Sequence, residues 1–95
     1  MDGHDVYVLI ALRASGLLLQ NKTAHTVILG PGDEAALRAS RAIPDASDTL
    51  RVTALTNIDK HTRGLGESFP SHDPVPMTLR IQSGGKDGDP QVLAD

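Results

Sequence analysis

Cysteine and tryptophan are absent from this 95-residue chain, and Tyr7 and Phe69 are its only aromatic residues. The lack of cysteine excludes disulfide bonds and thiolate metal sites. The lack of aromatic rings removes the stacking surfaces on which single-stranded nucleic acids bind. A net charge of −3 gives a nucleic acid no electrostatic attraction either. We therefore expect no nucleic-acid partner, and a core built from leucine, isoleucine and valine.

A basic leader is also missing. The chain begins with the acidic stretch MDGHD, and Arg13 closes the apolar run that follows. A secretory signal has a basic start, and a membrane-spanning helix needs about 20 apolar residues. These features predict no export signal and no membrane association, so we expect cytoplasmic synthesis.

Glutamate is scarce, because only Glu34 and Glu67 among the 12 acidic residues are glutamates. Aspartate favours turns and caps, whereas glutamate favours helix interiors. Together with 9 glycines and 6 prolines, this composition predicts many turns and few long helices.

The apolar pattern predicts strands between these turns. The run from 6 to 12 is continuous and rich in β-branched residues, which is typical of a strand buried on both faces. Residues 14–16 end in glycine and predict a hairpin turn into the leucines at 17–19. Alternating or β-branched apolar residues predict further strands at 26–29, 49–56 and 77–82.

The segment 33–43 allows two interpretations. Asp33 could cap a helix that ends before Pro44, but the apolar residues form no clean helical stripe. A strand is favoured by the pentapeptide ALRAS, which also closes the first predicted strand. We favour the strand and predict a mostly β fold, a small single-domain β-sandwich or barrel of about six short strands. The alternative is an α+β fold with a short helix at 33–43.

This pattern divides the chain into a β-rich domain at 1–82 and an extended polar tail at 83–95. Within the domain, residues 58–75 show no apolar periodicity and predict a long loop. Loops of this length in a small domain are usually functional or disordered.

The histidines give no metal signal. No two of them have the i, i+2 or i, i+4 spacing that places two ligands on one face. Nearby aspartates at 5, 59 and 73 do not complete a set of ligands. We expect no metal site from these four residues: His4, His25, His61 and His72.

Other chemical motifs are incomplete. Asp87-Gly88-Asp89 offers oxygen ligands for calcium but lacks the later carboxylates of a calcium loop, and so predicts a plain turn. Gly64-Leu65-Gly66 lacks the third glycine and the preceding strand of a phosphate-binding loop. No serine lies in a nucleophile elbow. We expect no catalytic residue and no cofactor, and hence a protein that is not an enzyme.

Because we expect no catalytic chemistry, we expect the protein to function through contacts with partners. A first strand that is apolar on both faces leaves one face for another subunit, and the 58–75 loop concentrates charge beside an aromatic residue. The candidate interface residues are Tyr7, Leu9, Lys60, His61, Arg63 and Phe69.

Two functions fit these features. The first is a structural protein that packs against copies of itself and a larger scaffold, such as a phage capsid decoration or head–tail joining protein. It would be a homo-oligomer or part of a larger assembly, incorporated in a virion. The second is a soluble binding module or accessory subunit of an enzyme complex that uses the 58–75 loop.

Overall fold

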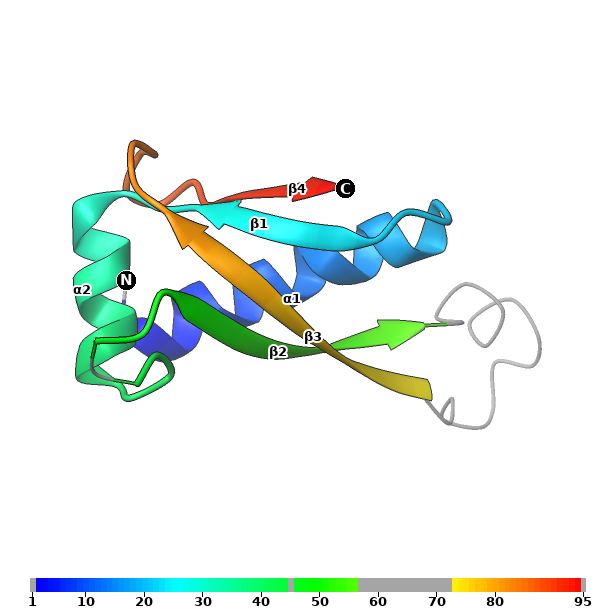
Figure 1. The fold of residues 1–95 in the computed structure, drawn as a ribbon, viewed down its shortest axis with the longest axis horizontal. Coiled ribbons are helices and arrows are strands. Elements are labelled where there is room, and N and C mark those ends of the chain that lie inside the picture. Colours follow the sequence, from blue (N-terminus) through cyan, green and yellow to red (C-terminus); the bar gives the residue numbers. More distant parts are fainter. Residues whose placement is uncertain (1, 45, 57–72, 95) are drawn as a thin grey trace.

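Two helices and a four-stranded sheet make up the fold of the computed structural model, which describes residues 2–44, 46–56 and 73–94 (Figure 1). In chain order the elements are α1 (Gly3–Leu19), β1 (Ala24–Ile28), α2 (Pro31–Ala39), β2 (Thr49–Thr56), β3 (Asp73–Gln82) and β4 (Gln91–Ala94). The prediction of a β-sandwich or barrel is therefore wrong, and the domain is α+β.

The strands are ordered β2-β3-β1-β4. The central pair, β1 and β3, is parallel, with Thr26 opposite Arg80. The β2–β3 and β1–β4 pairs are antiparallel. In Figure 1, α1 runs behind the strands and α2 stands at one end of the sheet. This arrangement leaves the front face of the sheet without a helix.

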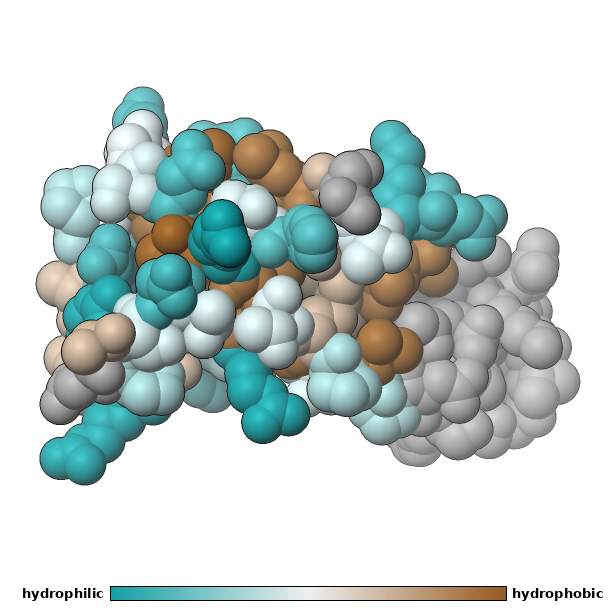
Figure 2. Space-filling model, in the orientation of Figure 1, coloured by the Kyte–Doolittle hydropathy of each residue, from teal (hydrophilic) through white to brown (hydrophobic). Residues whose placement is uncertain are grey.

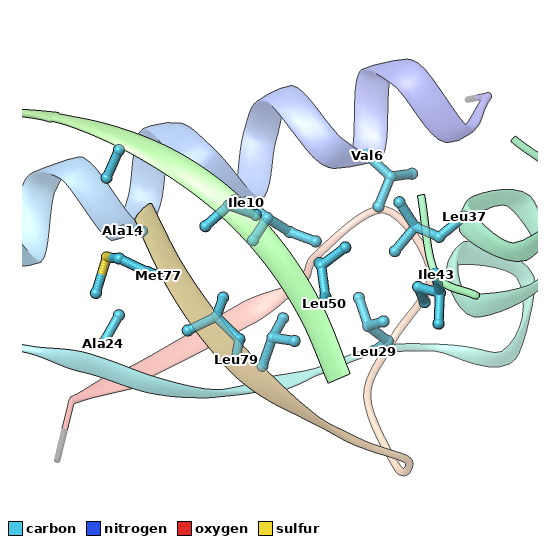
Figure 3. Close-up of a cluster of buried hydrophobic side chains, with 13 residues drawn as sticks. Val6, Ile10, Ala14, Ala24, Leu29, Leu37, Ile43, Leu50, Met77 and Leu79 are labelled. Atoms are coloured by element: carbon cyan, nitrogen blue, oxygen red, sulfur yellow. The ribbon is translucent and has the colours of Figure 1, made fainter. Parts of the chain in front are cut away.

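The core lies between α1 and the rear face of the sheet (Figure 3). Alternate residues of β2 and β3 point into it, as the two-residue period of a strand requires. On the helix side, Val6, Ile10 and Ala14 are fully buried and recur at every fourth position. They meet the buried strand residues Val27, Leu50, Val52, Ala54 and Leu79, and the buried Leu29, which follows β1.

Clear local signals begin and end α1. The Asp2 side chain accepts a hydrogen bond from the Asp5 backbone N–H at 3.0 Å and so caps the first turn. At the other end, Asn21 has φ of 62°. The Asn21 and Lys22 N–H groups donate to the carbonyls of Leu18 and Leu17, which is the Schellman arrangement that closes a helix.

The predicted strand at 6–12 and hairpin at 14–19 are both wrong, because the whole segment belongs to α1. Valine and isoleucine favour strands only weakly, and tertiary packing overrides that preference. Apolar residues surround the helix on nearly every side, so the buried stripe did not stand out in the sequence. Gly16, which suggested a turn, lies within the helix.

Helix α2 replaces the strand that we favoured at 33–43. Pro31 occupies its first turn, where the missing N–H costs nothing, and Arg41 with φ of 66° follows its end. The alternative prediction of a short helix at 33–43 overlaps this element. Its nine residues and mixed polar composition give too short a helical stripe to be distinguished from strand alternation.

The strand predictions succeeded where alternation was regular. Strand β2 has the predicted bounds, and the predicted strand at 77–82 forms the second half of β3. Strand β3 begins earlier, at Asp73, so residues 73–75 of the predicted loop pair with β2. The predicted extended tail at 83–95 contains β4, which pairs with β1. The rest of the predicted loop lies outside the described residues.

Candidate interaction surfaces

The described residues contain no group of three or more histidine, aspartate or glutamate side chains placed to hold a metal ion. None of the helices in the described ranges is long and apolar enough to cross a membrane.

The acidic loop at 87–89 is used for structure. The Asp87 carboxylate accepts hydrogen bonds from the backbone N–H groups of Gly32 (2.8 Å) and Asp33 (3.2 Å). These N–H groups begin α2, so Asp87 caps that helix from a distant part of the chain. The turn predicted for Asp87-Gly88-Asp89 is consistent with Gly88, which has φ of 82°.

The side of α1 that faces away from the sheet is apolar. It exposes Val8, Leu12 and Leu19, with 41%, 59% and 46% of their surface accessible. These positions follow one another at helical spacing and lie on one side of the helix. A helix that is apolar on all sides is normally covered on all sides. We call Val8, Leu12 and Leu19, together with Ser15, which is buried at 5% exposure between them, the outer stripe of α1.

Charge is kept away from the outer stripe. Between Val6 and Leu19, Arg13 is the only charged residue. Its guanidinium donates to the Pro90 carbonyl oxygen at 2.6 Å and lies 3.2 Å from an Asp89 carboxylate oxygen. Arg13 therefore extends along the flank of α1 toward the segment before β4, and nothing charged interrupts the stripe.

A small apolar hollow adjoins the outer stripe. It has a volume of about 190 Å³ and lies between α1 and β2. Its lining comes from one side of α1 and a single residue of β2: Tyr7, Val8, Ala11, Leu12, Ser15 and Thr53. The Ser15 hydroxyl donates to the Ala11 carbonyl oxygen at 2.8 Å, so this polar group in the hollow is already satisfied. An apolar side chain that enters the hollow therefore leaves this hydrogen bond in place.

The open face of the sheet has the opposite character. Arg80 lies in register between Thr26 of β1 and Thr49 of β2, and Arg51 lies opposite Thr78. Figure 2 views this face, where hydrophilic and near-neutral side chains cover the middle of the sheet. A shallow depression of about 340 Å³ is lined there by His25, Thr26, Thr49, Thr78 and Arg80.

Arg51 and Arg80 form no ion pair with a carboxylate among the described residues. The open face is therefore cationic in a chain whose net charge is −3. No carboxylate lines the depression.

The structure places two of the predicted interface residues on α1. Tyr7 is half-buried against the core and lines the hollow, and Leu9 is half-buried on another side of the helix. The other predicted residues, Lys60, His61, Arg63 and Phe69, lie outside the described residues.

Sequence reasoning missed the most exposed residues of this surface, Val8, Leu12 and Leu19. Their spacing of four, then three and four residues through Ser15 is the seam pattern of paired helices, and could have identified them. The strand interpretation of residues 6–12 hid that pattern, because it placed Val8 and Leu12 on the same face as Val6 and Ile10.

Comparison of the chain with protein-family models, with curated proteins and with solved structures gave no match.

Proposed function

We propose that this chain is a non-catalytic assembly protein whose copies associate through the outer stripe of α1. The observation that supports this most is the set of exposed apolar residues Val8, Leu12 and Leu19, in a segment where Arg13 is the only charged residue. Solvated helices carry polar residues on the side away from the core. Exposed apolar patches of this kind are typical of protein–protein contacts.

The stripe is short, because α1 is only about 25 Å long. A pair of helices of this length forms a small interface, which predicts weak association that depends on concentration. A scaffold that holds several copies together strengthens such contacts by raising their effective concentration. The proposal therefore includes a larger assembly, for which a phage capsid or head–tail connector is the example suggested by the sequence.

The open face of the sheet is the surface that we assign to this scaffold. Arg51 and Arg80 offer two guanidinium groups that form no ion pair with any carboxylate of residues 2–44, 46–56 and 73–94, and threonine hydroxyls surround Arg80. Guanidinium groups pair well with carboxylates, so the fitting partner is an acidic protein surface. Replacing both arginines with glutamate should abolish capture by such a scaffold and leave self-association unchanged. Binding of the scaffold by the double variant at the wild-type level would contradict this assignment, even if salt weakens the binding of both chains.

Self-association is tested by the mass of the chain in solution over a concentration series up to about 1 mM. The wild-type chain should shift from monomer to dimer, and Leu12→Asp should remain a monomer because it places a charge in the stripe. Leu93→Asp is the matched control, since Leu93 is also an exposed leucine, with 41% of its surface accessible, but lies on β4. It should dimerise as the wild type does. A wild-type monomer throughout the series, or an unaffected Leu12→Asp variant, would overturn the proposal.

A further inference from the structure

We propose that two copies pair their α1 helices antiparallel about a two-fold axis, in a register set by the outer stripe. This inference rests on the proposed self-association and specifies its geometry. In this register Val8 lies opposite the partner's Leu19, Leu12 lies opposite the partner's Ser15, and Asp5 lies opposite the partner's Lys22. The two-fold axis repeats each pair, so the interface is closed and adds no third copy.

Spacing is the first argument. Val8, Leu12, Ser15 and Leu19 alternate between intervals of four and three residues, as the inner positions of two packed helices do. Asp5 lies three residues before Val8 within α1, and Lys22, which follows the end of the helix, lies three residues after Leu19. In an antiparallel pair, positions equidistant from the middle of the stripe meet one another. The stripe is therefore complementary to itself when one copy is reversed.

Shape is the second argument. Leu12 is the most exposed large apolar side chain of α1, at 59%. The hollow beside the small Ser15 is apolar, with a volume of about 190 Å³. Reversal of one helix brings each Leu12 over the Ser15 region of the other copy. A protruding side chain then enters a hollow at both halves of the interface, which is how paired helices interlock.

Charge is the third argument, and it selects a second copy as the occupant. Asp5 lies in the first turn of α1 and is exposed, whereas Lys22 follows the end of the helix and is also exposed. Neither side chain forms an ion pair within the described residues. Antiparallel pairing brings opposite charges together at both ends, and it also aligns the helix dipoles favourably. Parallel pairing would place Asp5 beside the partner's Asp5.

A charge exchange tests the direction of pairing. Asp5→Lys alone and Lys22→Asp alone should each raise the dimer dissociation constant about tenfold at low salt, because each puts like charges together at both ends. The double variant Asp5→Lys with Lys22→Asp should return to within about twofold of the wild type. The effect should shrink at high salt, since these groups are exposed. A double variant as weak as the single ones would overturn the register.

Crosslinking gives an independent test, because the chain has no cysteine of its own. A mixture of Val8→Cys chains and Leu19→Cys chains should form a mixed disulfide on oxidation, and neither variant alone should crosslink efficiently. Crosslinking of Val8→Cys with itself would show parallel pairing and overturn the register. In that case a dimer abolished by Leu12→Asp would still support the proposed function. A wild-type chain that stays monomeric would overturn both.

Discussion

Asp33 and Asp87 each bind the backbone of the other's segment. The Asp87 carboxylate accepts from the N–H groups of Gly32 and Asp33, and the Asp33 carboxylate accepts from the Gly88 N–H at 2.9 Å. Asp33 is 4% exposed. This reciprocal contact joins the start of α2 to the loop before β4, although the two lie far apart in the chain.

Replacement of Asp87 with alanine should lower the free energy of unfolding by about 1–3 kcal/mol, because it leaves helix N–H groups without an acceptor. Urea unfolding followed by circular dichroism measures the change. Asp48→Ala is the control, since the Asp48 side chain is exposed and forms no hydrogen bond within the described residues. Equal stability of the two variants would mean that the cap contributes nothing.

Alanine should have opposite effects at two glycines of α1. A Cβ atom at Gly3 would lie 2.7 Å from the Ser40 Cβ, so Gly3→Ala must push α1 and α2 apart. A Cβ atom at Gly16 would meet nothing within 4 Å. We expect Gly3→Ala to destabilise by about 1–3 kcal/mol and Gly16→Ala to stabilise by about 0.5–1 kcal/mol. Thermal melts of both variants check the signs, and two changes of the same sign would disagree with this packing.

Arg13 should hold β4 in place. Its bonds to the Pro90 carbonyl and Asp89 connect α1 to the segment that leads into β4, a strand of only four residues. In the Arg13→Ala variant, the backbone amides of β4 should exchange with solvent faster, by about fivefold to tenfold. Arg51→Ala removes a comparable guanidinium from the open face and should leave this exchange unchanged. If the β4 amides of the Arg13→Ala variant exchange as slowly as those of the wild type, pairing with β1 alone stabilises β4.

The cap of α1 should depend on pH. The hydrogen bond from the Asp5 N–H lowers the pKa of Asp2 below its ordinary value of 3.8. A carboxyl with a lowered pKa stabilises the folded state fully above that ordinary value, and the contribution is lost as pH falls through the folded-state pKa. Amide exchange in the first turn should therefore show more opening in acid. The Asp2→Asn variant keeps a capping side chain that does not titrate, so its amide exchange should depend less on pH. The same pH dependence as in the wild type would exclude the cap as the cause.

The sheet could be predicted better than the helices. Residues 50–54 of β2 alternate between core and solvent, and the pattern of Leu50, Val52 and Ala54 predicted the bounds of the strand correctly. In α1, the outer stripe and the buried stripe are both apolar, and their sum resembles a buried strand. The two stripes differ only in which one packs against the sheet, and the sheet takes its position only when the chain folds.

Long-range contacts explain the other failures. Strand β4 has only four residues, none of them fully buried, and it forms because β1 offers a free edge and Arg13 holds the preceding loop. The function of Asp87 as a cap for α2 could not be predicted from a turn motif. The predicted interface residues Tyr7 and Leu9 lie on α1 and are half-buried, and their contact with a partner stays a prediction.

The parallel pairing of β1 with β3 also affects how the chain folds. Thr26 meets Arg80 only after α2, β2 and the residues between β2 and β3 have been synthesised. Closing so long a loop costs conformational entropy before the new contacts compensate for that loss, and folding is slower as a result. During that delay α1 has no sheet to cover its buried side, so both of its apolar sides are exposed. A newly made chain is therefore most prone to aggregate before β3 is released, and dilution or a chaperone during synthesis should increase its yield.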